Sequence, residues 1–328
     1  MNIYDIAHAA GVSIATVSRV LNNGVVGKKT RERVLRVMEE MGYTPNAFAR
    51  GLGLGTMNTV GVIVSNIYDL YFVRAVSVLE EKLRQQGYDL ILCCSSGDGA
   101  ERAKSLHLLA AKKVDALILV GSRFAEGEAL SAISQMARKL PIFCIGGQID
   151  LPGVYSVLCD DRDGVKSTVT TLYSKGHRDF LYLYDSTSPS GHNKRKGFLD
   201  GLALCGLNGD SKRTVRCSRD IAEAKSAVKR VFESGLSISA ILTSEDELAV
   251  GALQYGMEKG FSIPGELAVV GYNNSTLSRA TIPQLSSIDN KVDMLSSLAV
   301  ELLTKVFAGQ SPSSRIRIAA ELVERQTT

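Results

Sequence analysis

The pattern of apolar and polar positions divides the chain into a short helical head and a long body. In the head, apolar residues recur at helical spacing over 3–10, 14–21 and 30–41, which predicts three helices. From residue 59 onward, short apolar runs of strand type alternate with amphipathic stretches of helical type. This alternation is typical of parallel α/β sheets that helices cover on both faces.

The body contains more of these units than one sheet accommodates. The predicted strands are 60–64, 89–93, 116–120, 142–145, 180–184, 240–242 and 267–271. The predicted helices lie near 71–86, 100–112, 127–139, 162–175, 194–205, 220–234, 246–259 and 291–307. A loop near 146–160 separates two groups of units, so we expect two lobes, the first over about 58–158 and the second over about 159–287.

The first two helices of the head have the residue types of a helix-turn-helix unit. Gly11 ends the first helix at a position suited to a positive φ, and Ser13 is a natural N-cap for the second. Ala7 is small enough for the two helices to approach closely, and Val12 fills the corner between them. In such a unit the second helix enters the major groove of DNA by its N-terminal half.

The outward residues of the second helix are the candidates for reading DNA. Arg19 suits a bidentate contact to guanine, while Ile14 and Ala15 suit a thymine methyl group. The other candidates, which include short or planar donors suited to phosphate, are Ser18, Tyr4, Ser13, Thr16 and Asn22. Alternatively, Arg19 is only a solvated helix residue. The third helix, which we expect Thr30 to cap, adds further basic side chains.

The charge distribution supports a polyanionic partner for the head. The whole chain has a net charge of +4, and residues 1–57 carry seven Lys and Arg against four Asp and Glu. An excess of +3 therefore lies in the first sixth of the chain, and the body is close to neutral. This distribution indicates that the basic head binds a nucleic acid and that the neutral body binds a different ligand.

Two runs of the head resemble the DNA-binding headpiece of LacI/GalR-family transcriptional regulators. They are Ile3-Tyr4-Asp5-Ile6-Ala7 through Ala15-Thr16-Val17-Ser18-Arg19-Val20-Leu21-Asn22, and Gly42-Tyr43-Thr44-Pro45-Asn46-Ala47-Phe48-Ala49-Arg50-Gly51-Leu52. The resemblance implies a headpiece over 1–45 and a hinge over 46–57 that folds on DNA. It adds Asn46, Ala47, Arg50 and Leu52 to the DNA contacts, with Leu52 as a wedge in the minor groove. Alternatively, Leu52 packs against the headpiece. Residues 53–57 lack the Lys or Arg that is usual in the family.

The resemblance also implies that the body is a two-lobed core like periplasmic sugar-binding proteins, spanning 58–328. The chain is then expected to return to the first lobe over 288–312 and to the second over 313–328. Ligands of parallel α/β sheets lie beyond the carboxyl ends of the strands, where the sequence places Ser65-Asn66, Ser122-Arg123, Ser186–Asn193, Ser244-Glu245-Asp246 and Asn273.

Nine residues are the candidates for binding a small effector in the cleft between the lobes. They are Ser65, Asn66, Tyr71, Phe72, Asp160, Arg195, Glu245, Asp246 and Asn273. The resemblance implies that Arg195 clamps the effector, that Asp160 is an acidic cleft residue, and that Tyr71 and Phe72 lie beside the ligand. Each residue also has a purely structural alternative. Ser244 and Glu247 fit a capping box, Tyr71 and Phe72 fit a core, and Arg195 fits an ion pair.

Together these features predict a sequence-specific DNA-binding repressor, a homodimer on a palindromic operator, with a sugar-like effector. One alternative keeps this regulator and makes its signal a phosphocarrier protein, because Glu324-Arg325-Gln326-Thr327 and other segments loosely resemble the catabolite control branch. An α/β enzyme is the least favoured class, since we find no catalytic motif, metal-ligand spacing or cofactor loop. Six cysteines without a C-x-x-C pair, and no long apolar run, are typical of a cytoplasmic protein without a membrane span. No leucine heptads follow Arg325, which favours a dimer over a larger assembly.

Overall fold

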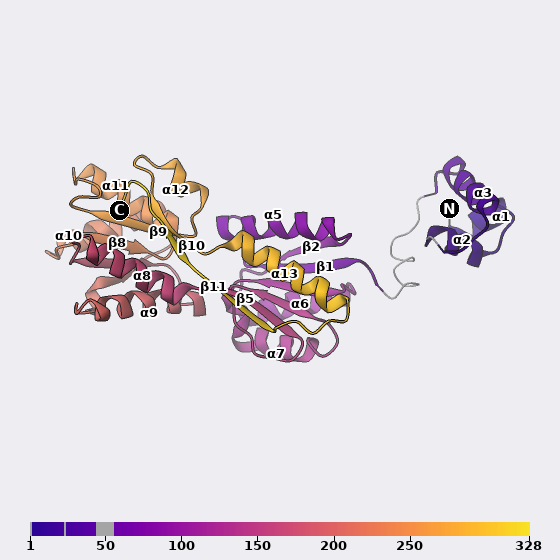
Figure 1. The fold of residues 1–328 in the computed structure, drawn as a ribbon, viewed down its shortest axis with the longest axis horizontal. Helices are drawn as coiled ribbons and strands as arrows, with labels where there is room; N and C mark the ends of the chain where they lie inside the picture. Colours follow the sequence, from indigo (N-terminus) through magenta and orange to yellow (C-terminus); the bar gives the residue numbers. More distant parts are fainter. Residues whose placement is uncertain (1, 23, 44–55) are drawn as a thin grey trace. The chain divides into compact units, whose positions relative to one another are not determined.

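The computed structural model describes residues 2–22, 24–43 and 56–328 (Figure 1). The chain forms two compact units, Met1–Thr59 with Lys113–Asp115, and Val60–Lys112 with Ala116–Thr328. The predicted hinge residues Asn46, Ala47, Arg50 and Leu52 lie outside the described residues.

In the described part of the first unit the chain forms three helices, α1 (Ile3–Ala9), α2 (Ile14–Leu21) and α3 (Lys28–Glu40). Their apolar faces enclose a small core of Ile6, Ala7, Ala10, Val17, Val20, Val34 and Met38. The prediction that Thr30 caps α3 is wrong. The helix begins two residues earlier, with Gly27 as an N-cap that makes no side-chain hydrogen bond, and the backbone N–H of Thr30 already donates to the carbonyl of Gly27.

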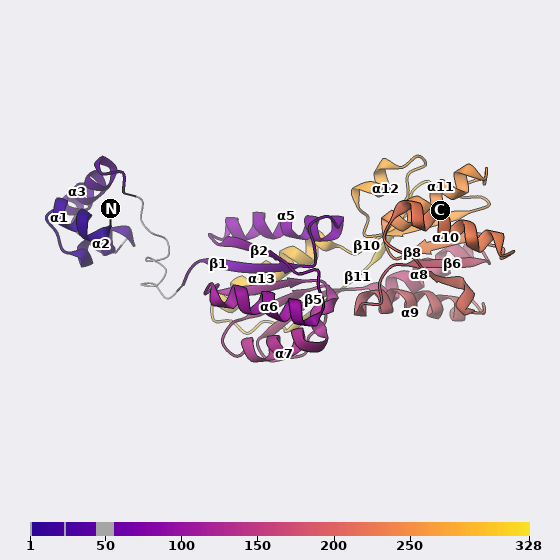
Figure 2. The ribbon, with the colours of Figure 1, turned by 180° about the vertical axis from the view of Figure 1, so that it is seen from behind.

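The second unit contains two sheets of six strands each, which form two lobes (Figure 2). The first sheet has the order β11-β5-β4-β3-β1-β2. Its strands are β1 (Thr59–Val64), β2 (Asp89–Cys94), β3 (Ala116–Val120), β4 (Ile142–Ile145), β5 (Val154–Asp160) and β11 (Arg315–Ala319). The helices of this lobe are α5 (Leu70–Gln85), α6 (Gly99–Ala111), α7 (Gly127–Met136) and α13 (Val292–Phe307), with a 3-10 turn η1 (Ser122–Ala125).

The second sheet repeats that arrangement in the order β12-β10-β9-β8-β6-β7. Its strands are β6 (Phe180–Tyr184), β7 (Thr214–Arg216), β8 (Ala240–Thr243), β9 (Ala268–Tyr272), β10 (Ser286–Asp289) and β12 (Glu321–Val323). The helices of this lobe are α8 (Asp161–Ser174), α9 (Pro189–Leu204), α10 (Ile221–Glu233), α11 (Asp246–Glu258) and α12 (Thr276–Ala280), with a 3-10 turn η2 (Ser211–Arg213).

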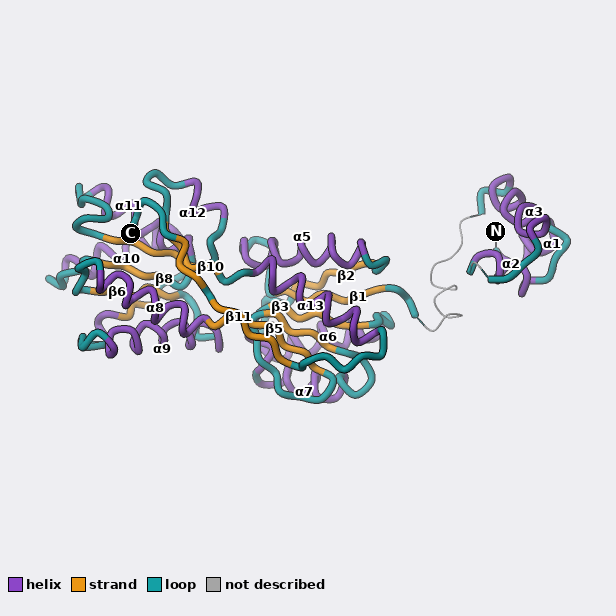
Figure 3. The backbone as a smooth tube through the Cα atoms, viewed as in Figure 1, coloured by secondary structure: helices purple, strands orange, loops and turns teal. Residues whose placement is uncertain are grey.

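The structure corrects the expected course of the chain in two places. Strand β5 occupies the second half of the expected loop near 146–160, from Val154 to Asp160. Residues 315–319 form β11 in the first sheet, parallel to β5, so the chain returns to the second lobe after Ala319 rather than at 313. Neither strand is an unbroken apolar run, since Ser156 interrupts β5 and Ile316 and Ile318 alternate with arginines in the exposed edge strand β11. Figure 3 shows the connections that join the lobes.

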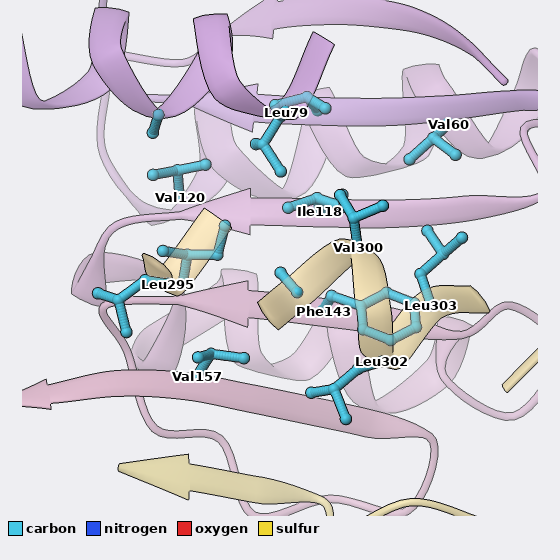
Figure 4. Packing of buried hydrophobic residues seen from close by; sticks show 14 of the residues in the cluster. Val60, Leu79, Ile118, Val120, Phe143, Val157, Leu295, Val300, Leu302 and Leu303 are labelled. Atoms are coloured by element: carbon cyan, nitrogen blue, oxygen red, sulfur yellow. The ribbon is translucent and has the colours of Figure 1, made fainter. Parts of the chain in front are cut away.

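The core of the first lobe explains why these elements stay together (Figure 4). Val120 of β3 and Phe143 of β4 are fully buried against Leu79 of α5 and Leu302 of α13. Helix α13, from a distant part of the sequence, therefore completes the face that α5 begins. The sheet held in this way fixes the ends of its strands, and the loops at those ends carry the functional groups described below.

Candidate DNA interface and effector cavity

The second helix of the head presents one buried and one exposed face. Val17 and Val20 are buried against the other helices, whereas Ile14, Ala15 and Arg19 are exposed. Ser13 fixes the start of this helix, since its Oγ accepts a hydrogen bond of 3.2 Å from the N–H of Thr16. Gly11 has a φ of +59°, which allows the sharp turn before it.

The remaining candidates of the head surround this exposed face. Tyr4 on α1 is 65% exposed, an unusual setting for so large a ring. Ser18 and Asn22 are half-buried and share a hydrogen bond of 3.4 Å between Asn22 Nδ2 and Ser18 Oγ. Asn22 is also the residue that ends α2. The head therefore offers an apolar and basic helix surface bordered by hydroxyl and amide groups.

One arginine of the third helix has a structural task. Arg31 donates from Nη2 to the carbonyl of Gly24 at 2.7 Å and from Nη1 to the carbonyl of Val20 at 3.4 Å. It thus binds the end of α2 and the following loop to α3. Its charge still adds to the positive potential of the head, but its side chain is held by the fold.

A cavity of about 650 Å³ lies between the two lobes of the second unit. The structure brings six of the nine candidate effector residues to its walls: Ser65, Asn66, Tyr71, Phe72, Glu245 and Asn273. They follow β1, begin α5, follow β8 and follow β9, as expected for carboxyl ends of parallel strands. The rings of Tyr71 and Phe72 pack edge to face with centroids 5.3 Å apart.

Three of the nine candidates do not line the cavity. Asp160 caps α8 through a hydrogen bond from the N–H of Asp163 and faces Arg317 of β11 at 3.4 Å. Arg195 donates to the Tyr184 hydroxyl at 3.3 Å. In both cases a sequence neighbour lines the cavity instead. On α9 it is Lys194, about 100° from Arg195 around the helix, and beside the N-cap Asp160 it is Asp161, the first residue of α8.

The third, Asp246, is completely buried beneath the cavity floor. Its carboxylate accepts hydrogen bonds from Ser287 Oγ at 2.6 Å and from the N–H of Ser275 at 2.7 Å. Gly271 leaves the space for this carboxylate, since a Cβ at that position would collide with it. Burial raises the pKa of Asp246 to about 6, against the hydrogen bonds from Ser287 and Ser275 that favour its charged form.

A network of charges that sequence reasoning missed is centred on Arg219, in the loop between β7 and α10. Its guanidinium lies 2.9 Å from Asp185 and 3.0 Å from Glu245, and it also pairs with Asp69 of the first lobe. Burial disfavours the charged guanidinium, but the carboxylates of Glu245, Asp69 and Asp185 raise the pKa of Arg219 overall. Arg219 therefore remains a cation and links the lobes.

Lys194 and Glu245 form the buried floor of this network. The Lys194 ammonium donates to the carbonyl of Ser244 at 2.9 Å, lies 3.4 Å from Glu245, and sits over the ring of Tyr272 at 3.8 Å. Burial raises the pKa of Glu245 to about 7, although Lys194 and Arg219 lower it. Asn273 also donates to this carboxylate from its amide nitrogen.

Two further hydrogen bonds join the lobes across the cavity. Arg123 Nη2 donates to Ser186 Oγ at 2.9 Å, and the N–H of Ser190 donates to Ser122 Oγ at 3.1 Å. The expected capping box of Ser244 and Glu247 is not formed, because Ser244 Oγ donates to Asp185 at 2.9 Å. Asp185 directly follows the predicted strand 180–184, so its place was available from the sequence, whereas nothing local marks Arg219.

The cavity combines carboxylates, amides, hydroxyls and cations beside two aromatic rings. Such an arrangement recognises a hydroxylated ligand, because paired donors and acceptors bind hydroxyl groups and a ring packs on an apolar sugar face. Among the described residues no cluster of three or more His, Cys, Asp and Glu is placed to hold a metal ion. The helices that the structure describes include none with the length and apolar character needed to span a membrane.

Comparison with known proteins gives the same two parts. Residues 2–46 match the model of bacterial regulatory proteins of the lacI family, and residues 57–326 match that of the periplasmic binding proteins and sugar binding domain of the LacI family. An HTH-type transcriptional regulator of Lachnoclostridium phytofermentans is 41% identical over 331 residues, covering 100% of this chain and 99% of that protein. The catabolite control protein A of Priestia megaterium is 30% identical, with coverage of 100% and 99%. The fold is similar to that of the lac repressor dimer bound to operator and an anti-inducer, with a TM-score of 0.91, 24% identity and coverage of 100% and 98%.

Proposed function

The chain belongs to the LacI family of bacterial DNA-binding transcriptional regulators, and from that premise we propose that it is a homodimeric repressor controlled by a sugar-like effector. One observation carries the proposal. A helix-turn-helix unit with an exposed reading surface is followed by a polar cavity whose walls come from two separate lobes. The first part binds an operator, and the second changes shape when a ligand joins its walls.

The reading surface assigns different tasks to its residues. Arg19 contacts a guanine, and Ile14 and Ala15 contact thymine methyl groups in the major groove. Tyr4, Ser13, Thr16, Ser18 and Asn22 position the unit on the phosphates. Because one such unit reads only a half-site, a palindromic operator requires two copies of the chain. The hinge residues Asn46, Ala47, Arg50 and Leu52 complete the interface in this proposal.

The cavity supplies the control. The contacts that join the lobes, Asp69 with Arg219, Ser122 with Ser190 and Arg123 with Ser186, are all at its walls. An effector that binds one arrangement of the lobes more tightly than another shifts the population toward it. A change in the first lobe then alters how the two hinge segments of a dimer meet the operator.

Fluorescence anisotropy with the full chain tests this proposal. The probes are a labelled palindrome with a central C-G step and a scrambled duplex of the same composition, each over a series of salt concentrations. We expect Arg19→Met to weaken binding of the palindrome by about 1–3 kcal/mol of binding free energy. The weak, salt-dependent binding of scrambled DNA should be nearly unchanged.

A matched control is Arg84→Met, an exposed arginine of α5 in the other unit that pairs with Glu80, which we expect to bind DNA like the unchanged chain. Equal affinity of the unchanged chain for the palindromes tried and for scrambled DNA would argue against sequence-specific binding. If Arg19→Met and Arg84→Met lose the same affinity for the palindrome, Arg19 contributes only general positive charge.

A second candidate keeps the repressor and makes its signal a phosphocarrier protein that docks on the first lobe. The 30% identity to a protein named catabolite control protein A favours it. In the same anisotropy assay, a phosphorylated carrier that raises operator affinity without any small molecule would support this candidate, and the unphosphorylated carrier is its control.

A further inference from the structure

Two arginines lie on the first-lobe wall of the cavity, apart from the network around Arg219. Arg102 is in the first turn of α6, and Arg123 is in the turn η1 that follows β3. Both line the cavity, together with Ser96, Gly97 and Ser122. They follow β2 and β3, the strands on either side of β1 in the same sheet, and both lie on the same wall of the cavity, close enough to repel each other.

Arg102 is buried without a counter-charge. Arg102 is only 8% exposed, and its Nη1 donates a hydrogen bond of 2.7 Å to the carbonyl of Gly97. The Nε–H is buried and has no hydrogen-bond partner. Among the ion pairs of the described residues, none involves Arg102 or Arg123. A buried donor left in this way costs free energy unless a ligand satisfies it.

The nearby carboxylates do not neutralise this pair. Asp98 accepts a hydrogen bond of 3.1 Å from the N–H of Glu101 and so caps α6, and Glu126 is exposed at the start of α7. Burial, followed by repulsion from Arg123, lowers the pKa of Arg102 despite the attraction of these two carboxylates. The two arginines therefore repel each other in a partly dry wall.

In the opposite part of the cavity every cation has a carboxylate partner. Arg219 contacts three carboxylates, and Lys194 contacts Glu245. A ligand there meets a strongly polar surface without unmatched positive charge. The cavity thus has one region with unmatched positive charge and one region of paired charges and amides.

We propose that the effector carries an anionic group, a phosphate monoester or a carboxylate, that Arg102 and Arg123 bind, while its hydroxylated part contacts the region of Asp185, Glu245 and Asn273. The proposal rests on the effector-binding function proposed above and specifies its ligand class. Guanidinium groups bind these oxyanions through short, charge-assisted hydrogen bonds, and two of them fit a tetrahedral or planar anion well. Because Arg123 also donates to Ser186 of the second lobe, an anion bound there contacts a link between the lobes.

Thermal unfolding of the full chain with inorganic phosphate tests the anion site directly. We expect phosphate to raise the melting temperature more than chloride at equal ionic strength. This specific rise should be lost in Arg102→Met and in Arg123→Gln. It should persist in Arg138→Met, an exposed first-lobe arginine outside the cavity. Arg123 is exposed, so its variant reports on the site even if Arg102→Met folds poorly.

Titration calorimetry with matched sugars then distinguishes the two anions. Each set consists of a neutral hexose, its 6-phosphate and its sugar acid. We expect one anionic member of a set to bind at least tenfold more tightly than the neutral sugar, and Arg102→Lys to retain more of this preference than Arg102→Met. A preference for the 6-phosphate assigns a phosphate monoester, and a preference for the acid assigns a carboxylate.

Several results would overturn the inference. Phosphate that stabilises all variants equally, or no more than chloride does, shows that the arginines do not form an anion site. A neutral hexose that binds as tightly as its anionic counterparts removes the charge requirement. Operator binding separates this inference from the proposed function. If a neutral sugar releases the operator, the proposed repressor function is supported and the anion site is contradicted. If an anion binds through Arg102 but leaves operator affinity unchanged, the anion site is supported and the proposed control of operator binding is contradicted.

Discussion

The two lobes of the core have the same strand order but different interiors. Read from the same edge, β2-β1-β3-β4-β5-β11 corresponds to β7-β6-β8-β9-β10-β12. Only the last strand differs in direction, since β11 is parallel to β5 whereas β12 is antiparallel to β10. The first lobe encloses an apolar core between its sheet, α5 and α13. Both lobes bury charged residues beside the cavity, Asp69 and Arg102 in the first and Lys194, Glu245 and Asp246 in the second.

This difference shows that topology and chemistry are separable in this molecule. The repeated sheet supplies the same loop positions in both lobes, and the side chains at those positions decide what each wall does. In the second lobe Lys194 and Glu245 form a buried ion pair, and Asp246 accepts hydrogen bonds from Ser287 and Ser275. In the first lobe Asp69 pairs across the cavity with Arg219, whereas Arg102 and Arg123 face each other without a carboxylate partner. The following substitutions test how far this contrast extends to stability.

The largest effect is expected from Arg219→Met. The substitution leaves the carboxylates of Asp69, Asp185 and Glu245 without their shared cation in a half-buried site, and breaking such a pair typically costs about 3–5 kcal/mol of unfolding free energy. Urea denaturation at pH 8 measures the loss. We expect much of it to disappear at acidic pH, where the carboxylates bind protons. A loss below about 1 kcal/mol would mean that the second-lobe network contributes no more than a surface ion pair.

A smaller, pH-dependent effect is expected from Asp246→Asn. The pKa of Asp246 is raised from its ordinary 3.8 to about 6, so the folded protein retains a proton that the unfolded chain releases as the pH increases. The stability contributed by this group is present below pH 4 and is lost as the pH rises through 6. Relative to Asp246→Asn, the unchanged chain should therefore lose about 2.4 kcal/mol between pH 4 and pH 7.5.

Urea denaturation of both proteins across this pH range measures that difference. The matched control is Asp200→Asn, because Arg162 lowers the pKa of Asp200 through a side-chain hydrogen bond. The difference in unfolding free energy between the unchanged chain and Asp200→Asn should be smaller and should change with pH in the opposite direction. The stability that Asp200 contributes is lost as the pH falls. A difference between the unchanged chain and Asp246→Asn that does not vary with pH would contradict the burial of a titrating carboxyl group in the second lobe.

The smallest effect is expected from Arg74→Met in the first lobe. Arg74 forms two hydrogen bonds with Asp293, of 2.7 Å from Nε and 2.6 Å from Nη2, so its geometry is as favourable as that of Arg219. Both side chains are more than half exposed, and such a surface pair contributes less than about 1 kcal/mol. Measured beside Arg219→Met, the variant isolates the effect of burial. Similar losses for the two arginines would remove the distinction between the lobes.

Elements with strong local signals could be predicted from the sequence. Helix 14–21 and strands 116–120, 142–145 and 180–184 have the predicted bounds. These signals depend only on neighbouring residues, as with the cap at Ser13, the turn at Gly11 and the unbroken apolar runs. They can therefore be recognised without knowledge of distant contacts. The polar residues at strand ends were available for the same reason, and Ser65, Asn66 and Asn273 do line the cavity.

Which of two neighbouring residues faces the cavity, and which charges meet there, depends on the packing of elements that are far apart in the chain. The packing of α9, which begins at Pro189, buries Lys194 beside the cavity and directs Arg195 to Tyr184. Strand β11 was missed because an exposed edge strand has few apolar residues, and its pairing with β5 joins segments far apart in the chain. Arg219 and Asp69 are likewise separated by 150 positions, and their pairing depends on how two lobes close over one cavity. Long-range packing sets these relations, and no local pattern in the sequence encodes them.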